Sequence, residues 1–144
     1  MCKPMPDPSR KLPVVEHGGT KTKEGNMTET ERKLQRFRQF KAGWHYGEGE
    51  RINRDCIEKA LALHREIDRT LSLKTNAFPG LCGEVVLTAY SGDHYWEFIF
   101  ETDGTLTLCH EMEDKEVCYR ENLPDWETAI KGETTLGALR KEKT

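Results

Sequence analysis

The chain has 144 residues, of which 33% are charged and 35% are hydrophobic, and its formal net charge is −3. This length suits a single domain with tails, and the acidic balance disfavours a nucleic-acid-binding protein with a broad basic surface. No apolar run is long enough to span a membrane, and no signal-type apolar segment follows the first residues. The five cysteines lack tight paired spacing, so we expect free thiols and a cytoplasmic location.

Composition divides the chain into three parts. Residues 1–26 are rich in Lys, Pro and Gly and show no hydrophobic periodicity, so we expect a disordered N-terminal tail. Residues 27–132 are predicted to form a single α+β domain. Residues 133–144 are expected to be a polar C-terminal tail.

A capping box at Thr28 and Glu31 predicts a helix that begins at Thr28 and ends near Lys41. Its few apolar residues share one face, and the rest of its surface is strongly charged. Such a surface is usually a solvated helix face, but a basic cluster can also bind an acidic partner. The basic residues that form the secondary binding candidates here are Arg32, Arg36 and Arg38.

The next segment, residues 43–50, has the sequence GWHYGEGE and is predicted to be a loop, because its glycines disfavour a helix. A phosphate-binding loop is not indicated, since no strand precedes the glycines and no Lys-Ser or Lys-Thr pair follows them. The main interpretation is a structural loop that Trp44 anchors on the core. In the alternative, Glu48 and Glu50 face a ligand, and Trp44, Tyr46 and Glu48 are secondary binding candidates.

A second helix is predicted to begin after a cap at Asn53 or Asp55 and to extend to about Leu71. Its apolar residues recur at helical spacing, so this helix is the best candidate to cover a sheet. His64 lies on the apolar face, where a histidine is more often a hydrogen-bonded core residue than a ligand. Residues 74–82 are expected to be a connector.

Residues 83–123 alternate apolar and polar side chains and predict an antiparallel meander of four strands. Turns are expected at Gly92-Asp93, at residues 102–104 and at Asp114-Lys115. At the second turn, a three-residue loop with Gly104 in a left-handed bulge keeps the large apolar side chains on one face. The residues predicted to pack under the helices are Val85, Leu87, Ala89, Trp96, Phe98, Phe100, Leu106, Leu108, His110, Met112, Val117 and Tyr119.

The opposite face of the meander is more polar and is the main candidate working surface. Tyrosine and arginine are enriched at the centres of protein interfaces. The alternative is that the N-terminal tail or the last helix covers this face. The predicted partner-binding residues are Tyr90, Tyr95, Glu97, Glu111 and Arg120.

After the sheet, Asp125 is predicted to cap a short helix that ends at Gly132. The predicted fold is therefore α+β. Two N-terminal helices pack on one face of a four-stranded antiparallel β-meander, and a short C-terminal helix follows.

Three short sequence patterns follow one another along the chain. They are Gly-Trp-x-Tyr-Gly-Glu-Gly at residues 43–49, Phe-Pro-Gly-x-x-Gly-Glu at residues 78–84, and Asp-Gly at residues 103–104. In this order the chain resembles a loose group of small bacterial proteins of unassigned activity from mobile-element or defence-related gene neighbourhoods. The resemblance spans about residues 41–123 and implies a helix followed by a meander. It carries over no activity, cofactor or functional residue.

The sequence contains no recognisable catalytic constellation, and we assign no catalytic residue, metal ligand or cofactor. Thiol catalysis is disfavoured because Cys109 and Cys118 are predicted to face carboxylates without a histidine base beside them. Zinc is disfavoured because the Cys and His residues lack short paired spacings, and the neighbours Cys109 and His110 point to opposite faces. The cysteines and histidines therefore do not decide whether the protein is an enzyme.

The function expected from these features is that of a non-enzymatic protein-binding accessory or inhibitor from a mobile-element or defence locus. Its partner is expected to be another protein rather than nucleic acid or a membrane. The alternative is a small-molecule- or metal-binding domain, or a hydrolase, that uses the carboxylates of the Gly-rich loop.

Overall fold

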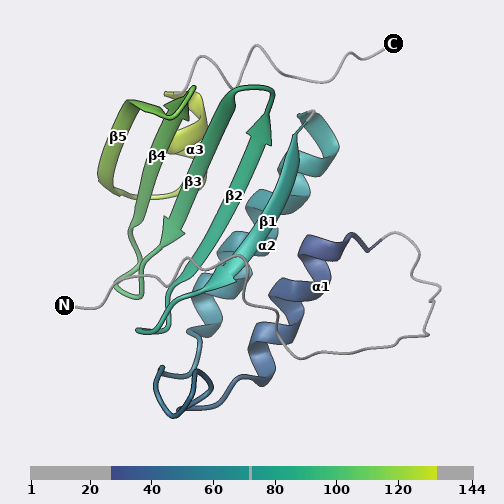
Figure 1. Ribbon diagram of the computed structural model, residues 1–144, viewed down its shortest axis with the longest axis vertical. Coiled ribbons are helices and arrows are strands. Elements are labelled where there is room, and N and C mark those ends of the chain that lie inside the picture. Colours follow the sequence, from purple (N-terminus) through teal and green to yellow (C-terminus); the bar gives the residue numbers. More distant parts are fainter. Residues whose placement is uncertain (1–26, 72, 133–144) are drawn as a thin grey trace.

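A computed structural model describes residues 27–71 and 73–132 (Figure 1). The predicted tails, residues 1–26 and 133–144, lie outside the described residues. The described part has an α+β architecture, as predicted, with a single antiparallel sheet whose five strands follow one another in sequence order. The elements are α1 (Glu29–Arg36), the 3-10 turn η1 (Phe37–Gln39), α2 (Arg54–Thr70), β1 (Lys74–Pro79), β2 (Val85–Ser91), β3 (His94–Phe100), β4 (Leu106–Met112), β5 (Lys115–Leu123) and α3 (Trp126–Lys131).

Each helix begins at a side-chain cap that the sequence predicts. Thr28 accepts a hydrogen bond from the backbone N–H of Glu31, and Asn53 caps α2 through the N–H of Cys56. Asp125 caps α3 in the same way. These oxygen acceptors satisfy backbone donors that have no partner within the helix, so the helix starts are fixed locally. The first helix is shorter than predicted, because α1 ends at Arg36 and tightens into η1.

The sheet has one strand more than predicted. We expected a connector over residues 74–82, but β1 pairs with β2 along its whole length, and Ala77 faces Leu87. The strand was missed because its alternation is carried by small and polar side chains rather than by large apolar ones. Pro79 stands at its last position, where a missing N–H costs the ladder little.

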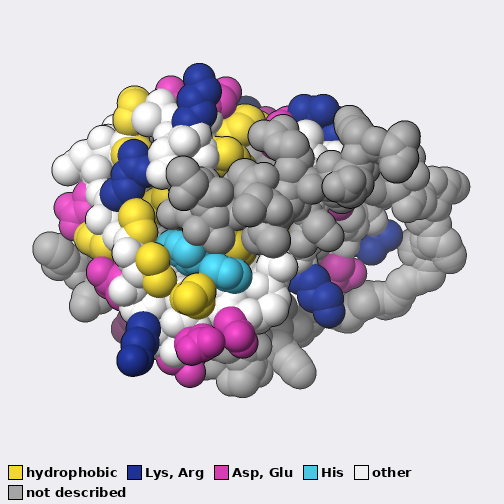
Figure 2. All heavy atoms as spheres, turned by 90° about the horizontal axis from the view of Figure 1, so that it is seen from above, with side chains coloured by type: hydrophobic (Ala, Val, Ile, Leu, Met, Phe, Trp, Pro, Cys, Tyr) yellow, Lys and Arg dark blue, Asp and Glu magenta, His cyan; other side chains and the backbone are white. Residues whose placement is uncertain are grey.

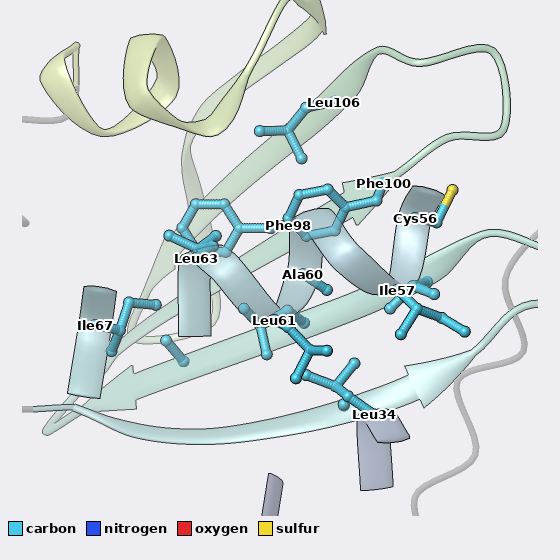
Figure 3. Packing of buried hydrophobic residues seen from close by; sticks show 14 of the residues in the cluster. Leu34, Cys56, Ile57, Ala60, Leu61, Leu63, Ile67, Phe98, Phe100 and Leu106 are labelled. Atoms are coloured by element: carbon cyan, nitrogen blue, oxygen red, sulfur yellow. The ribbon is translucent and has the colours of Figure 1, made fainter. Parts of the chain in front are cut away.

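The helices and the sheet enclose one hydrophobic core. Helices α2 and α3 lie against the same face of the sheet, and α1 lies beside α2 next to β1 (Figure 1). Figure 3 shows side chains from α1, α2, β3 and β4 meeting in this core. Burying such a cluster is the main favourable contribution to folding. Its fully buried large members are Leu34, Phe37, Ile57, Leu61, Leu63, Ile67, Leu87, Trp96, Phe98, Leu106 and Leu108.

The register of the central strands is confirmed. Ser91 pairs with His94 across the first turn, and Phe100 pairs with Leu106 across the second. Gly104 has φ +95°, the left-handed conformation that the predicted bulged loop requires. The side chains predicted to pack on these three strands are therefore buried on the helix-covered face, except Met112, which we expected to be packed and which is 40% exposed at the end of β4.

The register of the last strand differs from the prediction. The turn before β5 is formed by Glu113 and Asp114, both at positive φ, and not by Asp114-Lys115. Val117 is then bulged out, because Glu116 pairs with Glu111 while Cys118 pairs with His110. This extra residue shifts the facing of the residues that follow it.

The predicted facing of residues 117–120 is therefore wrong, including that of Cys118, which pairs with His110 on the helix-covered side. Arg120 pairs with Leu108 and lies on the helix-covered face, whereas Tyr119 pairs with Cys109 and lies on the opposite face. Val117 and Tyr119, which we expected to be packed, are exposed.

No helix in the described ranges has the length and apolarity needed to cross a bilayer.

Candidate functional site

The face of the sheet away from α2 and α3 carries two cross-strand rows of tyrosine and glutamate. In one row Tyr90 pairs with Tyr95, Tyr95 with Glu111, and Glu111 with Glu116. In the next row Glu97 pairs with Cys109, and Cys109 pairs with Tyr119. We call this surface the tyrosine–glutamate face. Its members are Tyr90, Tyr95, Glu97, Glu111, Glu116 and Tyr119.

The tyrosines of this face are partly exposed and partly held in place. Tyr119 is 50% exposed and Tyr90 is 36% exposed. The rings of Tyr90 and Tyr95 meet edge to face, with their centroids 5.6 Å apart. The hydroxyl of Tyr95 donates a hydrogen bond to Glu97 at 3.2 Å. Burial, followed by the charge of Glu97, raises the pKa of Tyr95, so this hydroxyl stays protonated and remains a donor.

The carboxylates of this face lie close enough to repel one another electrostatically. Glu111 and Glu116 stand directly opposite each other on β4 and β5, an arrangement that repels like charges. Burial raises the pKa of Glu97; its hydrogen bond from Tyr95 opposes that shift, and Glu111 adds to it. Burial and then Glu111, Glu116 and Glu97 raise the pKa of Cys109 to about 11. The charged neighbours that raise these pKa values are carboxylates, so the local field is negative.

The accessible part of this face is narrower than predicted. Val86, Thr88 and Thr107 share the face, but each is buried. Ile99 and Cys109 are half-buried. The surface that a partner can reach is therefore centred on β3, β4 and β5 together with Tyr90.

Of the five predicted partner-binding residues, four lie together on this face and Arg120 does not. The guanidinium of Arg120 lies against Gly132 at the end of α3, where it would collide with a Cβ atom at position 132. The guanidinium is therefore directed at the end of α3 and not toward a partner on the tyrosine–glutamate face. The sequence prediction missed Tyr119, because a bulge at an exposed valine leaves no trace in the apolar alternation.

The Gly-rich loop, the blue segment at the bottom of Figure 1, is a rigid structure separate from the tyrosine–glutamate face. Gly43 N–H donates to the carbonyl of Gly49 at 2.8 Å, and His45 and Glu48 form an isolated bridge. The indole N–H of Trp44 donates to the carbonyl of Glu50 at 2.8 Å. The interpretation of Trp44 as the anchor of a structural loop is supported by this bond.

The secondary candidates on this loop, on α1 and on η1 lie apart from the sheet face. Tyr46 is 83% exposed at φ +53°, and Glu48 is exposed. Arg32 pairs with Glu29, and Arg38 pairs with Glu58 at 2.7 Å. These pairs, and the position of Arg36 on α1, fit the interpretation of a solvated helix face.

The cysteines and histidines form no reactive centre in the described ranges. Cys56, Cys109 and Cys118 are free thiols, while Cys82 is disulfide-bonded, so the expectation of free thiols fails at Cys82. Because the pKa of Cys109 is raised, its thiol is a poor nucleophile at neutral pH. Among the described residues, no three His, Cys, Asp or Glu side chains are arranged to hold a metal ion.

Two histidines lie side by side on the helix-covered face. His94 Nδ1 is 3.0 Å from His110 Nε2, and both rings stack on Trp96. Figure 2 shows histidine side chains at the surface seen from above, beside hydrophobic and acidic side chains. The hydrogen bond between the two rings occupies both facing nitrogens, so this pair is a structural contact.

In comparisons with protein-family models, curated proteins and solved structures, none matches this chain.

Proposed function

We propose that this protein is a non-enzymatic accessory or inhibitor that binds another protein through its tyrosine–glutamate face. The observation that carries the proposal is the pair of cross-strand rows in which Glu97, Glu111 and Glu116 surround Cys109. A surface of this composition fits a partner segment that presents lysine or arginine.

The aromatic part of the face would supply most of the binding energy. Tyrosine offers a large rigid ring with a polar end, and truncation of such an anchor commonly costs about 2 kcal/mol of binding. Tyr90 and Tyr119 are exposed, and Tyr95 is fixed between Tyr90 and Glu97. A fixed ring loses little conformational freedom when a partner covers it.

The carboxylates would supply specificity and a faster association. Like charges placed opposite each other destabilise the free protein, and a cationic partner removes that repulsion. The face would therefore select a basic segment and reject an acidic one. The interaction should weaken as salt concentration rises, because exposed charges are screened.

The test is site-specific photo-crosslinking in an extract of the native host. A photoreactive amino acid is placed at position 119, and a matched control carries it at Glu127, which is exposed on α3. We expect a protein with a basic segment to be captured from position 119 and not from position 127. Equal capture from both positions, or capture that survives Glu111→Gln with Glu116→Gln, would contradict the proposal.

A second candidate function, small-molecule binding near the Gly-rich loop, is favoured by one observation. Glu50 lines a pocket of about 420 Å³. Sites for small ligands commonly have volumes of about 300–1,000 Å³. This candidate would be supported by binding that survives every substitution on the tyrosine–glutamate face.

A further inference from the structure

The pocket beside the Gly-rich loop has a charge that the sequence patterns did not predict. It has a volume of about 420 Å³ and lies where the loop, the start of α2, the segment before β2 and the turn before β4 come together. We call it the arginine pocket. The polar side chains that line it include Arg38, Glu50, Arg51, Asn53, Arg54 and Thr102.

The backbone around the arginine pocket is fixed by hydrogen bonds between segments far apart in sequence. The N–H of Glu50 donates to the carbonyl of Leu81, and the N–H of Asn53 donates to the carbonyl of Gly83, each at 2.8 Å. Gly83 has φ +92°, and a Cβ atom there would stand 2.9 Å from the carbonyl oxygen of Arg51. Such a close approach requires glycine, so the walls of the pocket are held in one arrangement.

The charge of the pocket is dominated by arginine. Among the residues that the structure describes, three guanidinium groups and one carboxylate line it. Arg38 is held by Glu58 at 2.7 Å, whereas Arg51 and Arg54 form no ion pair with any residue that the structure describes. Two guanidinium groups with no carboxylate partner in the described ranges favour an anionic ligand, and their planar donor groups suit phosphate oxygens.

We propose that the arginine pocket binds a phosphate dianion, either free or carried by a small organic molecule. Arg51 and Arg54 provide the charge, and Arg38 provides a third guanidinium that Glu58 holds in place. The positive end of the α2 dipole adds to the same field. Glu50 can accept a hydrogen bond from a hydroxyl or amino group of an organic ligand, which favours a phosphate ester over the free ion.

Isothermal titration of the full chain tests this proposal with three probes: adenosine 5′-monophosphate, adenosine and inorganic phosphate. We expect the monophosphate to bind and adenosine not to bind, since the phosphate is the recognised group. Binding of inorganic phosphate as tight as that of the monophosphate would identify the free ion as the ligand. Absence of binding by both phosphate probes would overturn the proposal.

Arg51→Gln and Arg54→Gln locate the binding site. Both side chains are exposed and have no carboxylate partner among the described residues, so the unfolding midpoint should be kept. Each substitution should weaken phosphate binding by about tenfold or more. The matched control is Arg32→Gln on α1, which should leave affinity unchanged. Equal losses in all three variants, or binding only to a long polyanion such as heparin, would contradict a small-molecule phosphate site.

Discussion

The hydroxyl of Thr28 lies 2.8 Å from Nε2 of His64, and this contact joins the cap of α1 to the buried face of α2. The oxygen of Thr28 already accepts the N–H of Glu31, so its own proton is free to be donated to Nε2. The other ring nitrogen, Nδ1, then carries the proton toward Thr75 at 3.4 Å, and Thr75 donates to Thr30. His64 is therefore a hydrogen-bonded core histidine, as predicted, and it is held in its neutral form.

The first prediction concerns pH and stability. Burial lowers the pKa of His64 below its ordinary value of 6.5, so the unfolded chain takes up a proton that the folded chain resists. The stability due to this group is complete above pH 6.5 and is lost as the pH falls through 6.5 toward the lower pKa of the folded state. The loss cannot exceed about 1.4 kcal/mol per pH unit, because one proton is involved.

Chemical denaturation at several pH values measures this effect. His64→Gln should lower the free energy of unfolding at pH 7.5 by about 1 kcal/mol or more through lost hydrogen bonds. The variant should also show a smaller decline between pH 7 and pH 5 than the unchanged protein. Parallel pH profiles for the two proteins would show that His64 does not carry the dependence.

The second prediction concerns Gly104. Its φ of +95° strains any other L-residue, whereas a Cβ atom there would meet nothing closer than Lys59 Nζ at 4.0 Å. Gly104→Ala should therefore lower the free energy of unfolding by about 1 kcal/mol through backbone strain alone. Gly104→Asn should cost less, because asparagine tolerates left-handed backbone. Equal midpoints for the alanine variant and the unchanged protein would exclude the bulged loop.

The third prediction concerns the facing pair Glu111 and Glu116. Glu116→Gln removes a repulsion between directly opposed carboxylates, so it should raise the free energy of unfolding by a few tenths of a kcal/mol. The same change should weaken binding of a basic partner, because the negative field decreases. Glu127→Gln, on an exposed position of α3, is the control and should do neither. Loss of stability in Glu116→Gln would show that this carboxylate has a stabilising partner.

The fourth prediction separates two neighbours on β5. Tyr119 is 50% exposed on the tyrosine–glutamate face, so Tyr119→Ala should change stability by only about 0.5 kcal/mol. Arg120 lies against the end of α3, so Arg120→Ala should loosen that helix and lower stability by about 1 kcal/mol. Hydrogen exchange of α3 amides reports the second effect. Faster exchange in Tyr119→Ala than in Arg120→Ala would place the two side chains on the faces that the sequence prediction gave them.

The sequence predicted the centre of the sheet well because its turns are chemically specific. Gly92 and Gly104 fix the lengths of two turns, and the large apolar side chains allow only one register between them. The last turn has no glycine, since Glu113 and Asp114 adopt positive φ themselves, and a bulge at Val117 follows. One misplaced residue there exchanged the faces of Tyr119 and Arg120.

The two candidate sites also differ in how far the sequence predicts them. Four residues of the tyrosine–glutamate face lie on strands whose register was predictable: Tyr90, Tyr95, Glu97 and Glu111. Their shared position on one face of the sheet was therefore predicted correctly. The arginine pocket depends on hydrogen bonds from residues 50–53 to residues 81–83, which are distant in sequence and carry no periodic signal. Charge alone did not indicate it, because its arginines occur among acidic neighbours.

The most direct test of the central claim is the affinity of the captured partner for a chain with both Glu111→Gln and Glu116→Gln, measured at low and at high salt. If the partner binds the tyrosine–glutamate face, the double variant should bind it about tenfold or more weakly than the unchanged protein at low salt, and its affinity should depend less on salt. The free energy of unfolding of the variant should be at least equal to that of the unchanged protein. Unchanged affinity with an unchanged salt dependence, in a variant that remains folded, would place the interface elsewhere.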